Sequence, residues 1–118
     1  MANKEPERAE EVLLAELHAA RVSYLKAIHA ARNQDFRQAQ EHIEKGDLHY
    51  DAGYAAHCEL LQQECSGAPS QVTLTMLHAE DQLVSAESCK IMALESLHIY
   101  RSLAELQQGN GQRLVRTA

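Results

Sequence analysis

The sequence predicts an all-α protein, an up-down-up antiparallel three-helix bundle. The first observation is composition: Ala and Leu together number 33, whereas Val, Ile and Thr together number 12. Small and straight-chain residues lose little freedom in helices, and a shortage of β-branched residues disfavours sheets. The second observation is the scarcity of helix-breaking residues, since 118 residues with only two prolines and five glycines have few places to turn. Long helices joined by short connections pack antiparallel.

Residues 1–107 form a single predicted domain. Two polar breaks divide it into helices near 7–33, 36–65 and 70–107. Residues 108–118 follow as a polar segment that we expect to be a flexible tail. A chain of this length holds one domain, because domains usually contain about 100–150 residues.

Each break carries a helix-capping signal. Asp35 with Gln38 three residues later fits a capping box for the second helix. At the second break, Gly67 can end a helix, and Ser70 after a proline can cap the third. Two glycines within the second helix each cost about 1 kcal/mol relative to Ala, so its middle is the weakest part of the prediction.

Charge and segment composition exclude several classes of protein. Eleven basic against seventeen acidic residues give a net charge of −6, and no basic run is present, so nucleic acid is not an expected partner. The charged N-terminus lacks the apolar core of a signal peptide, and no apolar run is long enough for membrane insertion. Three cysteines without a CxxC spacing suit reduced thiols. These features predict a cytoplasmic protein.

The third helix has more apolar residues than a three-helix bundle can bury. Leu74, Leu77, Val84 and Ile91 form one stripe, and Met76, Leu83, Met92, Leu94, Leu97, Ile99 and Leu103 extend it over a wider arc. A helix in such a bundle buries one side only. The excess predicts a homo-oligomer with this helix at its centre.

Polar residues interrupt the apolar stripes of all three helices. Arg21 interrupts the first, His57 the second and Asp81 the third, where His78 lies one turn earlier. If the second and third helices run antiparallel, Tyr54 and His57 face His78 and Asp81 in a polar layer. Arg21 is then about 10 Å away along the bundle axis. A charge among apolar residues needs a partner, a neighbouring subunit, water or a ligand.

Each of these residues also has an ordinary structural interpretation. With seven histidines and seventeen acids, one His-x-x-Asp/Glu pair is expected by chance, so the His78-x-x-Asp81 spacing also fits a surface pair. An arginine such as Arg21 is more often snorkelling or salt-bridged, and a histidine such as His57 is more often hydrogen-bonded between helices. A histidine-rich metal-binding bundle is disfavoured, because no two histidines have the i, i+4 spacing of helical zinc ligands.

A longer motif surrounds the histidine of the third helix. Val72-Thr73-Leu74 and Leu77-His78-Ala79-Glu80-Asp81-Gln82-Leu83 resemble the approximate signature V-S-L-x-x-V-H-A-Q-D-H-L-M. That signature belongs to the lactose/cellobiose family of IIA proteins of the phosphotransferase system (PTS). Ala20-Arg21 and Gln34-Asp35-Phe36 are also similar to that family, and the likeness covers roughly residues 10–105.

The resemblance implies a cytoplasmic homotrimer of nine helices that carries phosphoryl groups for uptake of a lactose-, cellobiose- or chitobiose-type sugar. His78 would accept the phosphoryl group from the phosphocarrier HPr and pass it to a cysteine of the IIB partner. Asp81 would meet its two symmetry mates at the trimer axis around one divalent cation, by expectation Mg²⁺. A hard cation with oxygen ligands relieves the repulsion between three carboxylates.

The chain departs from the signature at Glu80, where the family has Gln, and at Gln82, where it has His. A Glu80 carboxylate close to His78 would repel an incoming phosphoryl group, so we expect Glu80→Gln to speed phosphoryl acceptance. The alternative function is a divergent, non-catalytic or regulatory relative that binds partner proteins as an oligomeric bundle. Candidate supporting residues of the site are Glu80, Gln82, His57, Tyr54 and Arg21.

Overall fold

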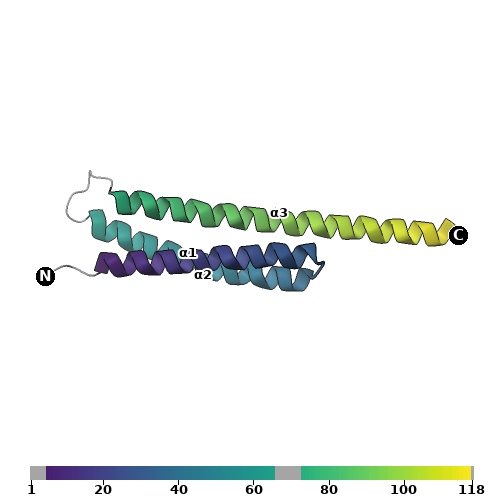
Figure 1. Cartoon of the computed structure of the whole chain (residues 1–118), viewed down its shortest axis with the longest axis horizontal. Coiled ribbons are helices and arrows are strands. Elements are labelled where there is room, and N and C mark those ends of the chain that lie inside the picture. The colour runs from purple at the N-terminus through teal and green to yellow at the C-terminus, as the bar shows by residue number, and fades with distance from the viewer. Residues whose placement is uncertain (1–4, 66–72, 118) are drawn as a thin grey trace.

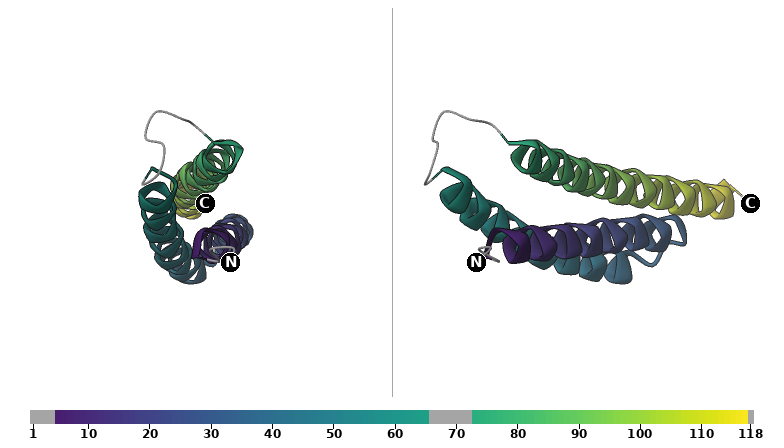
Figure 2. Two further views of the ribbon diagram at one scale, coloured as in Figure 1. Left: turned by 90° about the vertical axis from the view of Figure 1, so that its left-hand side faces the viewer. Right: turned by 60° about the vertical axis from the view of Figure 1, so that its left-hand side comes forward.

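The computed structural model describes the backbone of residues 5–65 and 73–117 and the side chains within 8–63 and 73–110. Helices α1 (Glu5–Arg32), α2 (Phe36–Cys65) and α3 (Leu74–Thr117) follow one another, and the described residues contain no strand. The helices lie at the corners of a triangle when seen end-on (Figure 2), and α3 projects beyond the other two (Figure 1). The predicted all-α, up-down-up three-helix fold is confirmed.

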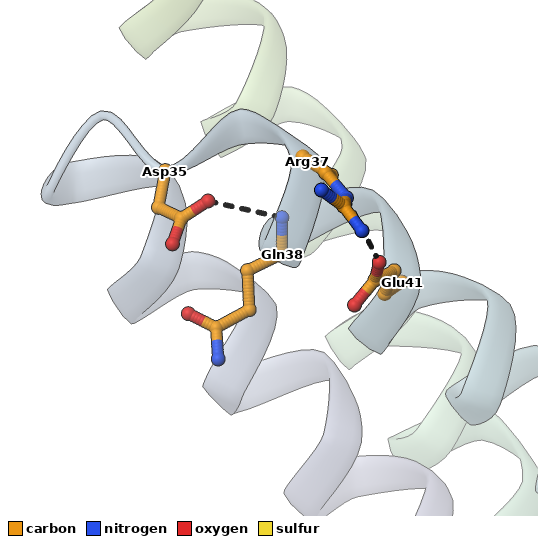
Figure 3. Close-up of polar contacts among 4 residues, drawn as sticks. All are labelled: Asp35, Arg37, Gln38 and Glu41. Carbon is orange, nitrogen blue, oxygen red and sulfur yellow. Dashed lines mark hydrogen bonds and ion pairs between the residues drawn. The ribbon is translucent and has the colours of Figure 1, made fainter.

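A tight turn joins α1 to α2. Gln34 adopts a left-handed conformation with φ of 63°, and the Asp35 amide donates to the Ala30 carbonyl at 2.9 Å. The Asp35 carboxylate then accepts a hydrogen bond from the Gln38 amide at 3.2 Å (Figure 3). Asp35 is therefore the predicted N-cap of α2, since it satisfies an amide that the helix itself leaves unpaired.

The two glycines of α2 lie where the helix meets α1 most closely. A Cβ built on Gly46 would lie 2.5 Å from Cε1 of Tyr24, and one on Gly53 would lie 2.6 Å from Cδ2 of Leu17. Both distances are far below van der Waals contact. The glycines that weaken α2 as an isolated helix thus provide the space into which two large α1 side chains pack.

The core consists mainly of alanines around a few large side chains, and it divides into two clusters. One comprises Ala20, Tyr24, Ala27, Ala30, Ala31, Ala39, Ile43, Ala93 and Leu97. The other comprises Ala9, Leu13, Leu17, Ala56, Leu60, Ala79, Leu83 and Ala86. The half-buried ring of Tyr50 packs against both clusters, so it joins the two parts of the core.

Helix α3 has apolar residues on two opposite sides. The side facing α1 and α2 buries Ala79, Leu83, Ala86, Ala93 and Leu97. The opposite side carries an outer stripe, defined here as Leu74, Leu77, Val84, Ile91, Met92, Ile99, Leu103 and Leu106, all at least 47% exposed. The polar layer predicted from the sequence requires the first four of these, which flank Asp81, to face the bundle's own interior, and this is wrong. Alanines form most of the true inner face. A prediction based on hydrophobicity alone selects the larger side chains on the opposite side instead.

The start of α3 differs from the predicted position. The Thr73 hydroxyl accepts a hydrogen bond from the Met76 amide at 3.1 Å, so Thr73 caps a helix that begins at Leu74. The expected cap, Ser70, lies outside the described residues.

The end of α3 also differs, because the helix continues to Thr117 instead of stopping near residue 107. The predicted helix end near residue 107 is therefore wrong, whereas the flexibility expected for residues 108–118 stays a prediction. Gly109 lies in open space, with nothing within 4 Å of a built Cβ. Each glycine costs a helix about 1 kcal/mol relative to Ala, yet α3 continues through both Gly109 and Gly111. No described helix is long and apolar enough to span a bilayer.

Candidate functional site

A groove of about 460 Å³ lies beside the first turns of α3. Glu10 of α1 lines one side, and Leu74, Thr75, Leu77, His78 and Asp81 of α3 line the other. The groove thus combines one imidazole, one hydroxyl and two carboxylates with the beginning of the outer stripe. It is the place where the motif residues of the sequence gather.

His78 projects into this groove from the second turn of α3 and is exposed. Among the described residues it has no hydrogen-bond or ion-pair partner. An imidazole whose nitrogens are not engaged can present a lone pair to an electrophile. The arrangement therefore suits a nucleophile that a second protein can approach.

Asp81 lies one turn after His78, between Leu77 and Val84, and is exposed. It interrupts the outer stripe with a carboxylate that has no cationic partner in the described part of the chain. The described residues of one chain also contain no cluster of three His, Cys, Asp or Glu side chains able to hold a metal. A single subunit offers only one carboxylate at this point.

Glu80 points to the other side of α3. Its Oε1 lies 2.9 Å from Nε2 of His57, whose side chain is 6% exposed. Residues two apart on a helix project about 200° apart, so Glu80 and His78 occupy nearly opposite faces. Our expectation that the Glu80 carboxylate repels a phosphoryl group at His78 is therefore wrong in its geometry, because the carboxylate is held by His57 instead.

The structure does not bring His57, Tyr54, His78 and Asp81 into one polar layer. His57 is buried between α2 and α3, while His78 and Asp81 face outward. The Tyr54 ring is 51% exposed and lies tilted beside His57, with ring centroids 6.2 Å apart. The predicted layer fails because His78 and Asp81 belong to the outer side of α3.

Two further sequence candidates lie apart from the groove. Arg21 is half-buried on α1, and its Nη1 atom is buried with no hydrogen-bond partner among the described residues. Gln82 is half-buried on α3. Neither side chain lines the groove that contains His78.

Sequence reasoning missed a polar link across the middle of the bundle. The Tyr24 hydroxyl donates to Oδ1 of Asp47 at 2.6 Å, and Nζ of Lys90 lies 3.0 Å from the same oxygen. Burial raises the pKa of the Tyr24 phenol well above its ordinary value, and the hydrogen bond to Asp47 adds to this effect. One antiparallel alignment of α2 and α3 pairs Asp47 with Lys90 and also His57 with Glu80, because the residue numbers of each pair have the same sum. This shared alignment of two polar pairs was a signal in the sequence that could have predicted the contacts.

Comparison with known proteins identifies relatives of this chain. The family model described as "PTS system, Lactose/Cellobiose specific IIA subunit" matches residues 13–101. The chain belongs to this family. The match includes every motif residue that carried the sequence resemblance from Ala20 to Leu83, and the resemblance is confirmed.

Individual members of the family are similar over most of their length. The lichenan-specific phosphotransferase enzyme IIA component of Bacillus subtilis (strain 168) is 32% identical over 85 residues, which cover 72% of this chain and 77% of that protein. The PTS lactose-specific EIIA component of Lacticaseibacillus casei is 28% identical over 95 residues, covering 80% and 85%. The crystal structure of PtcA from S. mutans has the same fold, with a TM-score of 0.72 at 24% identity over 86% of this chain and 99% of that one.

Membership of the IIA family gives the chain a role in phosphoryl transfer within a sugar phosphotransferase system, in which IIA components work with HPr and IIB proteins. The groove at the start of α3 is the candidate site for this phosphoryl transfer.

Proposed function

We propose that this IIA component is a cytoplasmic phosphocarrier in which His78 accepts a phosphoryl group from phosphorylated HPr and passes it to a IIB cysteine. The sugar would be of the lactose, cellobiose or chitobiose type. The observation that carries the proposal is the exposed His78 imidazole, which has no partner among the described side chains, in a groove of a IIA-family chain. Exposure is essential because both the donor and the acceptor are other proteins.

In the proposed reaction, an imidazole nitrogen of His78 attacks the phosphorus, and the bond between phosphorus and the HPr donor atom breaks. In the second step the IIB thiolate attacks, the N–P bond breaks, and the electron pair returns to the imidazole. Neutral imidazole is nucleophilic near neutral pH, so the group is received and released at one atom. The Thr75 hydroxyl, which lines the groove, is a neutral hydrogen-bond donor near the phosphoryl oxygens.

We further propose that three copies assemble through the outer stripe of α3. The stripe lies opposite the helix's buried side and runs from Leu74 to Leu106. Its first members, Leu74, Leu77, Val84 and Ile91, together with Asp81, follow the alternating three- and four-residue spacing by which helices pack against one another. A monomer rarely exposes so continuous an apolar surface, and coverage by further copies of α3 accounts for it.

In this assembly Asp81 would hold a divalent cation, by proposal Mg²⁺, one per trimer. The fit rests on the position of Asp81, an unpaired carboxylate within an apolar stripe. Three such carboxylates from three copies would repel one another, and carboxylate oxygens are the ligands that hard divalent cations prefer. The cation would supply positive charge that offsets the carboxylates near His78.

The first experiment is intact mass spectrometry after incubation with phosphoenolpyruvate, enzyme I and HPr. We expect the chain to gain the mass of one acid-labile phosphoryl group, and His78→Ala to gain none. His18→Ala is the matched control, because His18 is exposed on α1 away from the groove, and it should behave as the wild type. If the folded wild-type chain gains no mass while HPr is phosphorylated, the proposal is wrong and the non-catalytic, partner-binding alternative is favoured.

A further inference from the structure

We infer that the His57–Glu80 pair is a positioning element for phosphoryl transfer: it fixes the rotation of the first turns of α3 so that His78 faces the groove. The inference rests on the proposed function of His78. It concerns Glu80, one of the two positions at which the motif departs from the family signature, and its partner His57 on α2.

The contact is built as a specific anchor. His57 is buried, and its Nε2 atom is 2.9 Å from Glu80 Oε1, within hydrogen-bond distance. Its other nitrogen, Nδ1, is buried without a hydrogen-bond partner, so Glu80 is the only polar group that holds this ring in the described structure. Without Glu80 both nitrogens of this buried ring would lack a partner, which is costly, so the fold favours the rotation of α3 that keeps Glu80 within reach of His57.

Apolar packing holds this part of α3 only weakly. Of residues 73–83, only Ala79 and Leu83 are buried, and a methyl group gives little resistance to rotation of the helix. Leu74 and Leu77 are exposed on the outer stripe. The Glu80 side chain is 59% exposed, but its contact with buried His57 ties this segment to α2 where apolar packing is sparse.

The other polar contacts of α3 are too far away to take over this role. Among the described residues they are Asp47–Lys90 and Gln34–Gln107. At 1.5 Å per residue, Lys90 lies about 18 Å along the helix from His78, and Gln107 lies farther still. Glu80 is within one turn of His78 on nearly the opposite face, so a tether at Glu80 sets the direction of His78 directly.

The test compares four variants for the rate of His78 phosphorylation by HPr, measured at several HPr concentrations so that kcat and KM separate. Glu80→Ala and His57→Ala should each lower kcat by at least about threefold, and a displacement of about 1 Å could cost up to about 100-fold. Glu80→Gln retains an oxygen that accepts the Nε2–H, so it should restore a rate within about twofold of the wild type. Gln107→Ala removes the distant contact of α3 and serves as the matched control, with an unchanged rate.

Hydrogen exchange of the amides over 73–83 provides a readout that does not depend on phosphoryl transfer. We expect faster exchange there in Glu80→Ala and His57→Ala, no additive effect in the double variant, and protection restored in Glu80→Gln. If the wild type is phosphorylated and Glu80→Ala has the same kcat, the positioning role is refuted while the function of His78 stands. If the wild type accepts no phosphoryl group, the proposed function fails and the positioning role fails with it.

Discussion

Replacement of Gly46 by alanine should destabilise this protein, although alanine is the better helix former. The added Cβ would lie 2.5, 2.7 and 2.9 Å from the Cε1, Cδ1 and Cζ atoms of Tyr24. The ring cannot move aside easily, because it is fully buried and its hydroxyl is bonded to Asp47, which also contacts Lys90. Relief of the clash therefore requires either separation of α1 from α2 or loss of the polar link.

The opposing contributions can be compared in size. Overpacking a close-packed core costs about 1–3 kcal/mol, and loss of a hydrogen bond to a charged group costs about 1.5–3 kcal/mol. The intrinsic helix preference of Ala over Gly returns about 1 kcal/mol. Either cost exceeds this gain, so we expect Gly46→Ala to lower the free energy of unfolding by about 0.5–2 kcal/mol. The same change at Gly109, where nothing lies within 4 Å, should leave stability unchanged or raise it by up to about 1 kcal/mol.

Urea denaturation at one fixed protein concentration measures both changes. Tyr24→Leu provides a further check, since removal of the ring should make the additional cost of Gly46→Ala much smaller. A Gly46→Ala protein as stable as the wild type would contradict the close packing described for α1 and α2. So would a cost that is the same with and without the Tyr24 ring.

Three other predictions test the assembly, the cation and the buried tyrosine. Leu77→Arg should give monomers in light scattering, because it places a charge in the outer stripe, whereas Leu48→Arg, at a 71% exposed position of α2, should leave the mass unchanged. Chelation by EDTA should lower the melting temperature of the wild type and Mg²⁺ should restore it, with no response in Asp81→Asn; a wild type indifferent to both would exclude the cation. Because burial raises the pKa of Tyr24, the native state keeps a proton that the unfolded state releases above about pH 10. Stability should therefore fall as pH rises through that region, and fall less in Tyr24→Phe; equal slopes in urea titrations would refute this.

Composition and turn signals were enough to predict the number, order and direction of the helices, and Asp35 marked the start of α2 correctly. The side of α3 that faces the bundle was not predictable in the same way. Its inner face is mostly alanine, whereas leucine, valine and isoleucine lie outside, so the more hydrophobic stripe was mistaken for the internal one. The length of α3 was underestimated because a glycine weakens an exposed helix without ending it.

The motif located the groove that contains His78 and Asp81, but not the partners of the neighbouring residues. Spacing shows that Glu80 is close to His78 along the chain, whereas a helix turns the two side chains apart. The pairing of Glu80 with His57 depends on the register between α2 and α3. His57 lies level with Glu80 in this register, and the rotation of α3 turns His78 and Asp81 outward, away from His57.

If copies assemble as proposed, the two-sided character of α3 would link the folding of one subunit to the abundance of the protein. In the proposed trimer, burial of the outer stripe contributes to stability only when copies meet, so by mass action the free energy of unfolding rises with protein concentration. A cell that makes little of this protein would hold subunits with the stripe uncovered, and these are exposed to aggregation and proteolysis. The affinity between subunits would then set the lowest concentration at which the IIA component stays assembled and protected.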